Sequence, residues 1–186
     1  MAKIIVIGGG IAGCTTALEL AARGHKIVIL EQNKDILQGT SAGTPGRMGL
    51  GYHYFDFNTA KFYMENTVEF MKKYSDCFLG NQKESYLQDG RYFVVKNSLI
   101  PLQNLMATYD AVSLSFEEMC EKNPANKIFK SLHLHHALRT SEFEDVVNLE
   151  KVAFAIQTRE CLLDWGKFDQ ALRKEIARHS NIHVRT

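Results

Sequence analysis

Two apolar runs that flank a glycine-rich turn constrain the fold of this chain more than any other feature of its sequence. Ile4 to Ile7 is a run of β-branched residues, which is typical of a strand buried on both faces of a parallel sheet. A helix is predicted to follow and to end near Arg23, with Gly24 placed to close it, and Lys26 to Leu30 is predicted to be a second buried strand. The small and apolar residues predicted on the inner face of the helix are Ala12, Ala17, Leu18 and Ala21. The order strand, helix, strand predicts a parallel α/β sheet.

The glycines of the turn have the spacing of a dinucleotide-binding site. Gly8, Gly10 and Gly13 form the pattern GxGxxG, in which the first allows a tight turn, the second lets backbone approach a pyrophosphate, and the third lets helix and strand pack closely. Glu31 stands at the end of the second strand, where a carboxylate can accept hydrogen bonds from ribose hydroxyls and repel a 2′-phosphate. We therefore expect a Rossmann-like FAD/NAD(P)-binding βαβ domain that disfavours NADP. The alternative is a βαβ unit whose glycines serve packing alone.

A second glycine-rich segment, from Gly39 to Gly51, bears on which dinucleotide is bound. The polar residues on it and just after it are Thr40, Ser41, Thr44, Arg47 and His53. A plain NAD-binding domain usually passes from its second strand into another helix, whereas a segment of this kind can run back across a cofactor and offer N–H and hydroxyl groups to phosphates and a flat ring. The segment favours FAD, and the alternative is a flexible surface loop.

These motifs together resemble a known family. GGGIAG with Glu31, then LQGTSAGTPGRMGLGYHY, and finally TRECLLDWGKFDQALRKEIARHSNIHVRT are similar to the N-terminal part of FAD-dependent oxidoreductases of the D-amino-acid oxidase type. That group includes glycine and sarcosine oxidases, glycerol-3-phosphate dehydrogenase and 2-hydroxyglutarate dehydrogenase. The resemblance implies that the cofactor-binding residues are Gly8, Gly10, Ile11, Ala12, Gly13, Glu31, Gln32, Thr40, Ser41, Arg47 and Met48.

Within that set the resemblance implies different roles. The three glycines would face the pyrophosphate, Glu31 the adenosine ribose, and Thr40 and Ser41 a phosphate, while Arg47 and Met48 would lie near the flavin ring. His53 would lie close to the catalytic face, as a general base or a substrate-orienting residue. The alternative for His53 is a hydrogen-bonded structural histidine.

The resemblance also implies a reaction. A hydride would pass to flavin N5 from a carbon that bears an amine or a hydroxyl, in an amino-acid-like or 2-hydroxy-acid-like substrate, with reoxidation by oxygen or by an electron carrier. Two alternatives from other classes stay open. One is an NAD-dependent dehydrogenase domain, and the other is a truncated, non-catalytic dinucleotide-binding module.

The middle of the chain is predicted to begin a second, α+β substrate domain. A helix is predicted from Asn58 or Thr59 to about Tyr74. Its apolar stripe, which is more typical of core packing than of a cofactor site, consists of Met64, Val68 and Met71. Asp89 and Gly90, within the aromatic-rich stretch 85–95, predict a hairpin.

Two further helices are predicted after that hairpin. Pro101 is expected to start a short one, and Ser115 with Glu118 forms a possible capping box for another, which would end at Asn123-Pro124. The stretch 146–158 alternates and is expected to be a long strand or a hairpin, with one face formed by Val152, Phe154 and Ile156.

The last part of the chain is expected to return to the nucleotide domain. Asp164 is predicted to cap a helix, and its buried stripe consists of Phe168, Leu172 and Ile176. Asn181 to Arg185 is predicted to be a final strand. The resulting domains are 1–78 plus 159–186, an incomplete FAD-binding domain, and 79–158, a partial substrate domain.

A histidine cluster interrupts this pattern. His133 and His135 would share a face of a strand, with His136 on the other, so a metal site is conceivable. No cysteine or acid at ligand spacing completes such a site. We therefore expect no metal and interpret these residues as partly exposed strand histidines.

Composition limits the remaining classes. Of 186 residues, 45% are hydrophobic and 23% are charged, which is typical of a globular protein, and the net charge of +1 gives no basic surface for nucleic acid. No apolar run approaches the length of a membrane span. The four cysteines form no CxxC pair, which favours reduced thiols and a cytoplasmic location.

The resemblance has one consequence for partners. Members of the family run to about twice this length, so a small-molecule substrate would be held mostly by residues that this sequence lacks. We expect a fragment of a longer oxidoreductase; a split enzyme completed by a second chain and a degenerate product that folds poorly are the alternatives. Unpaired sheet edges are expected in each case.

Overall fold

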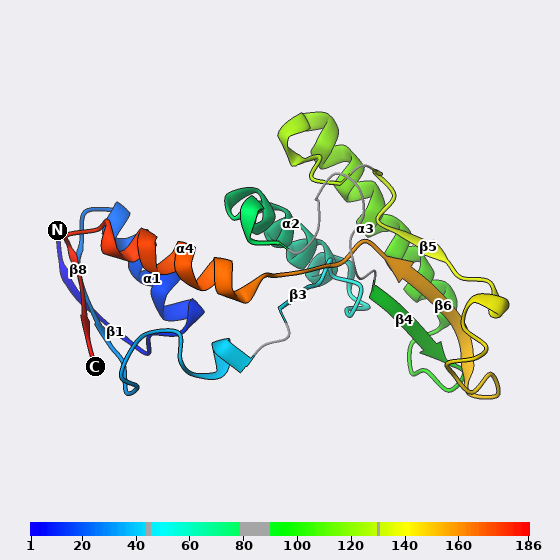
Figure 1. The fold of residues 1–186 in the computed structure, drawn as a ribbon. Helices are drawn as coiled ribbons and strands as arrows, with labels where there is room; N and C mark the ends of the chain where they lie inside the picture. Colours follow the sequence, from blue (N-terminus) through cyan, green and yellow to red (C-terminus); the bar gives the residue numbers. More distant parts are fainter. Residues whose placement is uncertain (44–45, 79–89, 130) are drawn as a thin grey trace. The chain divides into compact units, whose positions relative to one another are not determined.

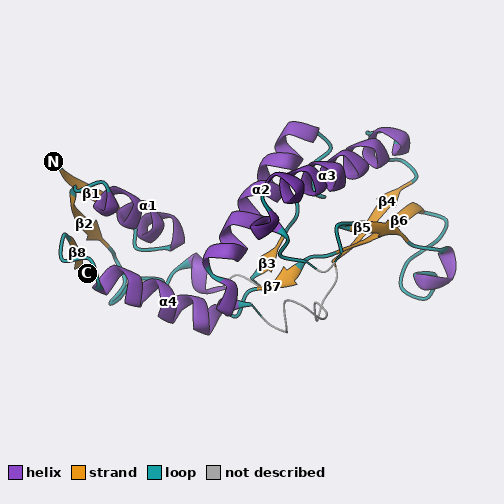
Figure 2. Cartoon of the chain, turned by 90° about the horizontal axis from the view of Figure 1, so that it is seen from above, coloured by secondary structure: helices purple, strands orange, loops and turns teal. Residues whose placement is uncertain are grey.

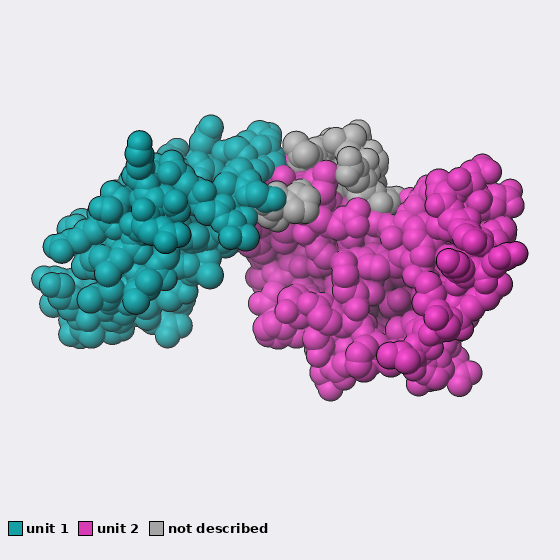
Figure 3. All heavy atoms as spheres, turned by 90° about the horizontal axis from the view of Figure 1, so that it is seen from below, with its two compact units in different colours: residues 1–46, 164–186 teal, residues 47–163 magenta. Residues whose placement is uncertain are grey.

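The computed structural model describes residues 1–43, 46–78, 90–129 and 131–186 (Figure 1). The chain divides into two compact units, which Figure 3 colours separately. Unit 1 comprises residues 1–46 and 164–186, and unit 2 comprises residues 47–163. Each unit is described by itself below. The predicted limits of an FAD-binding domain and a substrate domain are defined by function, and they stay a prediction.

Unit 1 is a parallel sheet with helices on one side (Figures 1 and 2). Its elements are β1 (Lys3–Ile7), α1 (Ile11–Ala22), β2 (Lys26–Leu30), α4 (Trp165–Ala177) and β8 (Ile182–Arg185). The strand order is β1-β2-β8, and both neighbouring pairs are parallel, with Ile27 in register with Ile4 and Ile182. The βαβ unit and the return of the C-terminal segment to the sheet are confirmed. The fold is α/β, as predicted.

The prediction that the first strand is buried on both faces is wrong. β1 is an edge strand of the described sheet, and only β2, in the middle, has a run of buried residues, Ile27 to Ile29. Ile5 and Ile7 are 60% and 88% exposed, because α1 and α4 cover only the opposite face. A β-branched run signals a strand, but it does not show which of its faces other elements cover.

The helix after the glycine turn begins and ends close to the predicted residues. Arg23 is its C-terminal cap, and Gly24 follows with a φ of +83°. Ala17, Leu18 and Ala21 are buried as predicted, but Ala12 is exposed and Cys14 takes its place on the inner face. The first turn is rotated relative to the expected face, because Gly13 and Cys14 rather than Ala12 lie against the sheet.

Unit 2 combines two long helices with antiparallel strands. Its elements are β3 (Arg47–Met48), α2 (Phe57–Lys73), β4 (Gly90–Val95), α3 (Leu102–Lys122), β5 (His135–Ala137), β6 (Val152–Thr158) and β7 (Cys161–Leu162). The larger sheet has the order β4-β6-β5, and β3 pairs with β7. Helices α2 and α3 run side by side in both views, and α3 lies beside β5 and β6 (Figures 1 and 2).

Most predictions for α2, α4 and β6 are confirmed. The stripe Met64, Val68 and Met71 is buried in unit 2, and the cap of α2 is Asp56, whose side chain accepts from the Thr59 N–H. Asp164 caps α4 through the Lys167 N–H. The buried stripe of α4 is Phe168, Leu172 and Ile176, as predicted. Only the second half of the stretch 146–158 forms a strand.

The prediction of two helices between Pro101 and Asn123 is wrong. A single helix, α3, covers this range, and Ser115 lies inside it, buried, rather than at a start. A capping motif inside a continuous amphipathic pattern does not start a new helix, because packing of the apolar face stabilises the longer helix more than one cap does. The predicted hairpin turn at Asp89, its first arm and Thr44 lie outside the described residues. Gly90, at its other end, begins β4, whose partner is β6.

The described helices include none that is both long enough and apolar enough to cross a membrane. The four cysteines are buried thiols that form no disulfide. Burial raises the pKa of the Cys14 thiol to about 11 and that of Cys161 to about 12. Thiols of this kind behave as small apolar side chains rather than as nucleophiles.

Candidate functional site

The glycine turn of unit 1 is built from backbone contacts that exclude side chains. Gly8 has a φ of +95°, and its N–H donates to the Leu30 carbonyl at 2.8 Å, which connects the turn to the end of β2. A Cβ on Gly13 would stand 1.8 Å from the carbonyl oxygen of Gly8. The third glycine therefore allows α1 to approach β1 closely, as its predicted packing role requires.

Glu31 lies against this turn. Its Oε2 accepts from the Gly9 N–H at 2.6 Å, and its Oε1 accepts from the backbone and side-chain N–H groups of Asn33 at 2.8 and 2.6 Å. These donors, the Asn33 backbone first, hold the pKa of Glu31 below its ordinary value. Each carboxylate oxygen has two lone-pair directions, and Oε2 accepts only one of these bonds, so it can accept one more. Its contact with ribose stays a prediction.

The N-terminus of α1 opens beside the turn. Its first N–H groups have no acceptor within the helix, and the N–H of Ile11 donates to Ser41 Oγ at 3.2 Å. The Ser41 hydroxyl keeps its own proton for another acceptor. The first turn of α1 contains no acidic residue that would repel an anion. Ala12, Gln32 and Thr40 belong to the same unit and are exposed.

The segment after Glu31 is fixed in place by unit 1 itself. Arg173 on α4 donates to Asp35 Oδ2 at 2.7 Å and to the Ile36 carbonyl at 2.6 Å. The Leu37 N–H donates to the Gly9 carbonyl at 2.8 Å, with Leu37 at a φ of 63°. The turn, the acid and the helix N-terminus therefore form one rigid cradle that fits the pyrophosphate and ribose of a dinucleotide.

The remaining predicted site residues belong to unit 2. Arg47 and Met48 form β3, in register with Leu162 and Cys161 on β7. His53 is exposed, and its Nδ1 lies 2.9 Å from the Tyr92 hydroxyl on β4. A cavity of about 570 Å³ adjoins these residues and is lined by Met48, Gly49, Gly51, His53, Tyr54, Tyr63 and Thr67. A cavity of this size can hold a small organic molecule.

A buried carboxylate stands behind His53. Glu160, between β6 and β7, has a side chain that is 0% exposed. Its Oε1 accepts from the Tyr92 hydroxyl and, at 3.4 Å, from the Leu50 N–H, while Arg47 Nε lies 3.9 Å from Oε2. Burial, followed by the hydrogen bond to Glu160, raises the pKa of Tyr92. We call Arg47, Leu50, His53, Tyr92 and Glu160 the Glu160 network.

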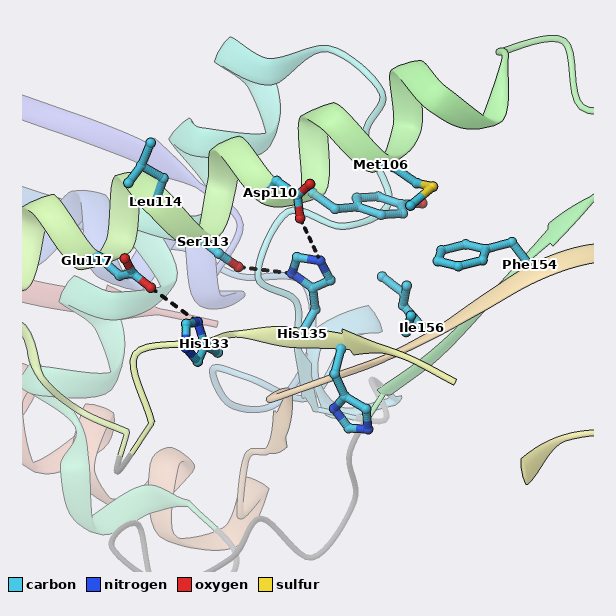
Figure 4. Close-up of a pocket in the computed structure, with 12 residues that line it drawn as sticks. Met106, Asp110, Ser113, Leu114, Glu117, His133, His135, Phe154 and Ile156 are labelled. Carbon is cyan, nitrogen blue, oxygen red and sulfur yellow. Dashed lines mark hydrogen bonds and ion pairs between the residues drawn. The ribbon is translucent and has the colours of Figure 1, made fainter. Parts of the chain in front are cut away.

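The predicted histidine cluster lines a different cavity of unit 2, about 400 Å³ in volume, between α3 and the strands β5 and β6 (Figure 4). His133 Nδ1 lies 3.3 Å from Glu117 Oε1, and His135 Nε2 lies 3.4 Å from Asp110 Oδ1. His135 Nδ1 faces Ser113 Oγ at 2.9 Å, and burial lowers its pKa. His133 and His135 thus each have a carboxylate partner on α3. No group of three ligating side chains occurs in the described part of the chain.

Sequence reasoning identified the residues of the cradle but missed Tyr92 and Glu160. Gly8, Gly13, Glu31 and Ser41 come together as the motif implies. Glu160 gave one usable signal, since it is a lone acid next to the apolar run Cys161 to Leu163. An acid at the end of an apolar strand is either exposed or paired inside, and spacing alone does not distinguish these outcomes.

Comparison with known proteins agrees with this geometry. A sequence model of the family described as "FAD dependent oxidoreductase" matches residues 3–178. Among curated proteins, the FAD-dependent monooxygenase kojA of Aspergillus flavus is 42% identical over 52 residues, which are 28% of this chain and 12% of that protein.

Two solved structures show the same fold along the whole chain. L-proline dehydrogenase from P. horikoshii has a TM-score of 0.58 and 20% identity, over 98% of this chain and 43% of its own. L-alpha-glycerophosphate oxidase from Mycoplasma pneumoniae, with FAD bound, has a TM-score of 0.56 and 19% identity, over 100% of this chain and 45% of its own. The chain thus spans less than half the length of each protein that it matches here.

Proposed function

The chain belongs to the family of FAD-dependent oxidoreductases, and from that membership we propose that it binds FAD in the cradle of unit 1 and contributes to the oxidation of a small molecule. The observation that carries this proposal is the cradle itself. Gly13 packs against the Gly8 carbonyl, and Glu31 lies beside the turn with its pKa lowered. This is the arrangement that a pyrophosphate and a ribose require.

The residues of unit 1 act by binding. The N–H groups at the start of α1 and the Ser41 hydroxyl donate to the pyrophosphate, and the Glu31 carboxylate accepts from the ribose hydroxyls. Ionised Glu31 also disfavours a 2′-phosphate. Gly10 leaves the approach to α1 open, since a Cβ there would have only Ser41 Oγ near it, at 3.1 Å.

The residues of unit 2 act on the reacting groups. FAD, when bound, supplies the hydride acceptor at flavin N5. We assign Arg47 and Met48 to the flavin ring and His53 to the proton of the substrate. Supporting observations are the family resemblance of the segment that carries them and the cavity that His53 and Met48 line. The substrate proposed is amino-acid-like or 2-hydroxy-acid-like, with an amine or hydroxyl on the carbon that is oxidised.

Two parts of the proposal concern the setting of the reaction. Because the chain spans 43% and 45% of the matching structures, we propose that turnover needs more polypeptide, from the same protein or from a second chain. Buried thiols that form no disulfide suit a reducing compartment, and we propose a cytoplasmic location. Activity assays of the chain, alone and mixed with candidate second chains, test the first part.

Flavin retention tests the assignment of the cradle. The absorbance spectrum of the purified chain is recorded before and after adding FAD and desalting. Wild-type protein is expected to keep a yellow flavin band, and Gly10→Val is expected to lose it because its side chain occupies the path of the pyrophosphate. Gly43→Val is the matched control, since a Cβ on Gly43 meets nothing within 4 Å. Retention of flavin by Gly10→Val, with its fold intact, would contradict the assignment.

Thermal unfolding with each dinucleotide separates the alternatives. FAD at a hundredfold excess over its Kd is expected to stabilise the binding-competent chain by about 2.7 kcal/mol, and NAD is expected to leave it unchanged. Stabilisation by NAD and not by FAD would instead identify an NAD-dependent dehydrogenase domain. No response to either would contradict a dinucleotide site in this chain, and stabilisation by FAD without activity in any mixture would indicate the non-catalytic dinucleotide-binding module.

A further inference from the structure

Burial of the Glu160 carboxylate is energetically unfavourable, and the proposed function does not explain it. Its carboxylate is fully buried, and its Oε2 accepts no hydrogen bond from the residues that the structure describes. Among the described residues, the cation that pairs with it is Arg47, whose side chain is 45% exposed and whose Nε lies 3.9 Å from Oε2. A buried acid with such incomplete pairing destabilises a fold relative to an apolar side chain of similar volume. Its presence therefore points to a role other than stability.

Two glycines line the space that this carboxylate occupies. A Cβ on Gly90 would stand 2.5 Å from Glu160 Oε2, and a Cβ on Gly49 would stand 3.7 Å from Oε1. Glycine at these places leaves the room that the acid occupies. In the described part of the chain, the groups that reach the acid are the Tyr92 hydroxyl, the Leu50 N–H and the Arg47 guanidinium. All three can donate, which matches an ionised carboxylate as acceptor.

The proton count of Tyr92 then determines the state of His53. A phenol has a single hydroxyl proton, and Tyr92 gives it to Glu160 Oε1. The contact of 2.9 Å between the Tyr92 oxygen and His53 Nδ1 must therefore be donated by the histidine. A neutral imidazole that carries its proton on Nδ1 has an unprotonated Nε2. That nitrogen lies on the side of the ring away from Tyr92, and His53 lines the cavity of about 570 Å³.

We propose that Glu160 is a positioning residue, which acts through Tyr92 to hold His53 in the Nδ1–H tautomer, so that Nε2 is the proton acceptor for a substrate in this cavity. Only one proton moves. The substrate's N–H or O–H bond breaks, the Nε2–H bond forms, and the ring takes the positive charge while Tyr92 and Glu160 keep their protonation. The buried carboxylate then stabilises the cationic ring through the tyrosine, as an acid behind a histidine does in other enzymes.

The identity of the proton donor rests on the proposed function, but the tautomer does not. It is measured in the 186-residue chain without FAD, by long-range ¹H–¹⁵N NMR of protein labelled in histidine, at about pH 8, where an ordinary imidazole is neutral. His53→Gln identifies the signals of His53 among the seven histidines. The wild-type ring is expected to show Nδ1 protonated and Nε2 unprotonated.

Two variants test the roles of Tyr92 and Glu160. In Tyr92→Phe the Nδ1–H pattern is expected to be lost, because the acceptor is gone. In Glu160→Ala the Tyr92 hydroxyl is free to donate to Nδ1, so the ring is expected to change to Nε2–H. Tyr109→Phe is the matched control, a buried tyrosine of the same unit whose hydroxyl bonds no described residue, and it should leave His53 unchanged.

The wild-type spectrum decides the proposal even where a variant does not fold. An Nε2–H ring in the wild-type protein would overturn it, because Glu160 would then be a proton donor to Tyr92. An Nδ1–H ring that persists in folded Tyr92→Phe or Glu160→Ala would overturn the assigned route. Failure to bind FAD would leave all these readouts intact, so failure of the proposed function and failure of this inference are distinguishable.

Discussion

Glu31 and Glu160 are two acids at comparable places, each just after a strand, and they have opposite surroundings. Glu31 in unit 1 is half-buried, and both of its oxygens accept from N–H groups at 2.6–2.8 Å. Glu160 in unit 2 is fully buried, and only its Oε1 accepts hydrogen bonds from the residues that the structure describes. Hydrogen bonds stabilise the ionised form of Glu31. Burial removes the Glu160 carboxylate from water, and its hydrogen bonds replace only part of the lost hydration.

This difference separates two ways of building a site. The centre of the cradle is the backbone of the glycine turn, so the substitutions it tolerates are limited by the glycines and by the distance between α1 and β1. The Glu160 network is made mostly of side chains, which come from β3, β4 and the segments that follow β3 and β6. The substitutions it tolerates are therefore limited by hydrogen bonds among partners far apart in the sequence. A change in the cradle should therefore act through sterics, and a change in the network through unpaired polar atoms.

Gly13→Ala should have the largest effect. Its methyl group would stand 1.8 Å from the Gly8 carbonyl oxygen, so α1 and β1 would have to separate. We expect unit 1 to lose at least about 3 kcal/mol of stability, together with FAD binding. Denaturant unfolding followed by the fluorescence of Trp165, the single tryptophan of the chain, measures the loss in this unit.

Gly24→Ala is the control for that variant. Gly24 has a φ of +83° but open space around its Cβ, so the change adds backbone strain without a clash, at a cost of about 1 kcal/mol. Equal losses in the two variants would show that conformational strain, and not close packing of helix on strand, explains the third glycine of the motif.

Tyr92→Phe should come next. It removes the hydroxyl that donates to Glu160 Oε1 and leaves a buried carboxylate with the Leu50 N–H at 3.4 Å and the distant Arg47. We expect a loss of about 1–3 kcal/mol in unit 2. Far-UV circular dichroism reports the helices of both units, and Trp165 fluorescence reports unit 1. A shift of the dichroism transition, with the fluorescence midpoint unchanged from wild type, therefore measures the loss in unit 2.

Tyr109→Phe calibrates this value. Tyr109 is buried in the same unit, and its hydroxyl bonds no residue that the structure describes, so the change should cost less than about 0.5 kcal/mol. A Tyr92→Phe loss no larger than this would mean that Glu160 is not a buried acceptor in solution. The contrast with Glu31 would then disappear.

The same contrast explains what the sequence could predict. The cradle is local. Gly8, Gly13 and Glu31 lie within one βαβ unit, and its strands and helix follow from short-range patterns, so fold class, turn and acid were predictable. The stripes of α2 and α4 were predictable for the same reason. The exposure of one face of β1 was not predictable, because the elements that cover a strand are not encoded in the pattern of the strand itself.

The Glu160 network depends on pairings that no local pattern encodes. Tyr92 and Glu160 are 68 residues apart, and they meet because β4 pairs with β6 so that Gly90 is in register with Thr158. His53 was singled out from the resemblance alone, and its partner came from that register. The short motif Ser115 with Glu118 shows the opposite error, in which a local pattern predicts a feature that the structure lacks. It predicted a helix start, but the longer apolar pattern of α3 continues through it.

The smallest expected effect is the pH dependence that Glu31 contributes. Its pKa in the folded chain is lower than the ordinary value of 4.5, because N–H groups of Asn33 and Gly9 bond the ionised form. The folded state therefore binds this proton less readily than the unfolded state does. The stability that results is complete above pH 4.5, and it is lost as the pH falls through the folded pKa.

Thermal unfolding of the chain between pH 3 and pH 6, compared with Glu31→Gln, measures this contribution. Glu31→Gln has no carboxylate to ionise at this position, so it lacks the stabilisation that ionised Glu31 gives the wild type. The unfolding midpoint of the wild type should therefore exceed that of the variant most above pH 4.5, and the two midpoints should converge below it. Asp56→Asn is the parallel control in unit 2, since Asp56 also has a lowered pKa, from its hydrogen bonds to Thr59 at the start of α2. Parallel profiles of unfolding midpoint against pH for Glu31→Gln and the wild type would show that the Gly9 and Asn33 donors do not favour the ionised acid. The assignment of Glu31 as an acceptor for ribose hydroxyls would then lose its support.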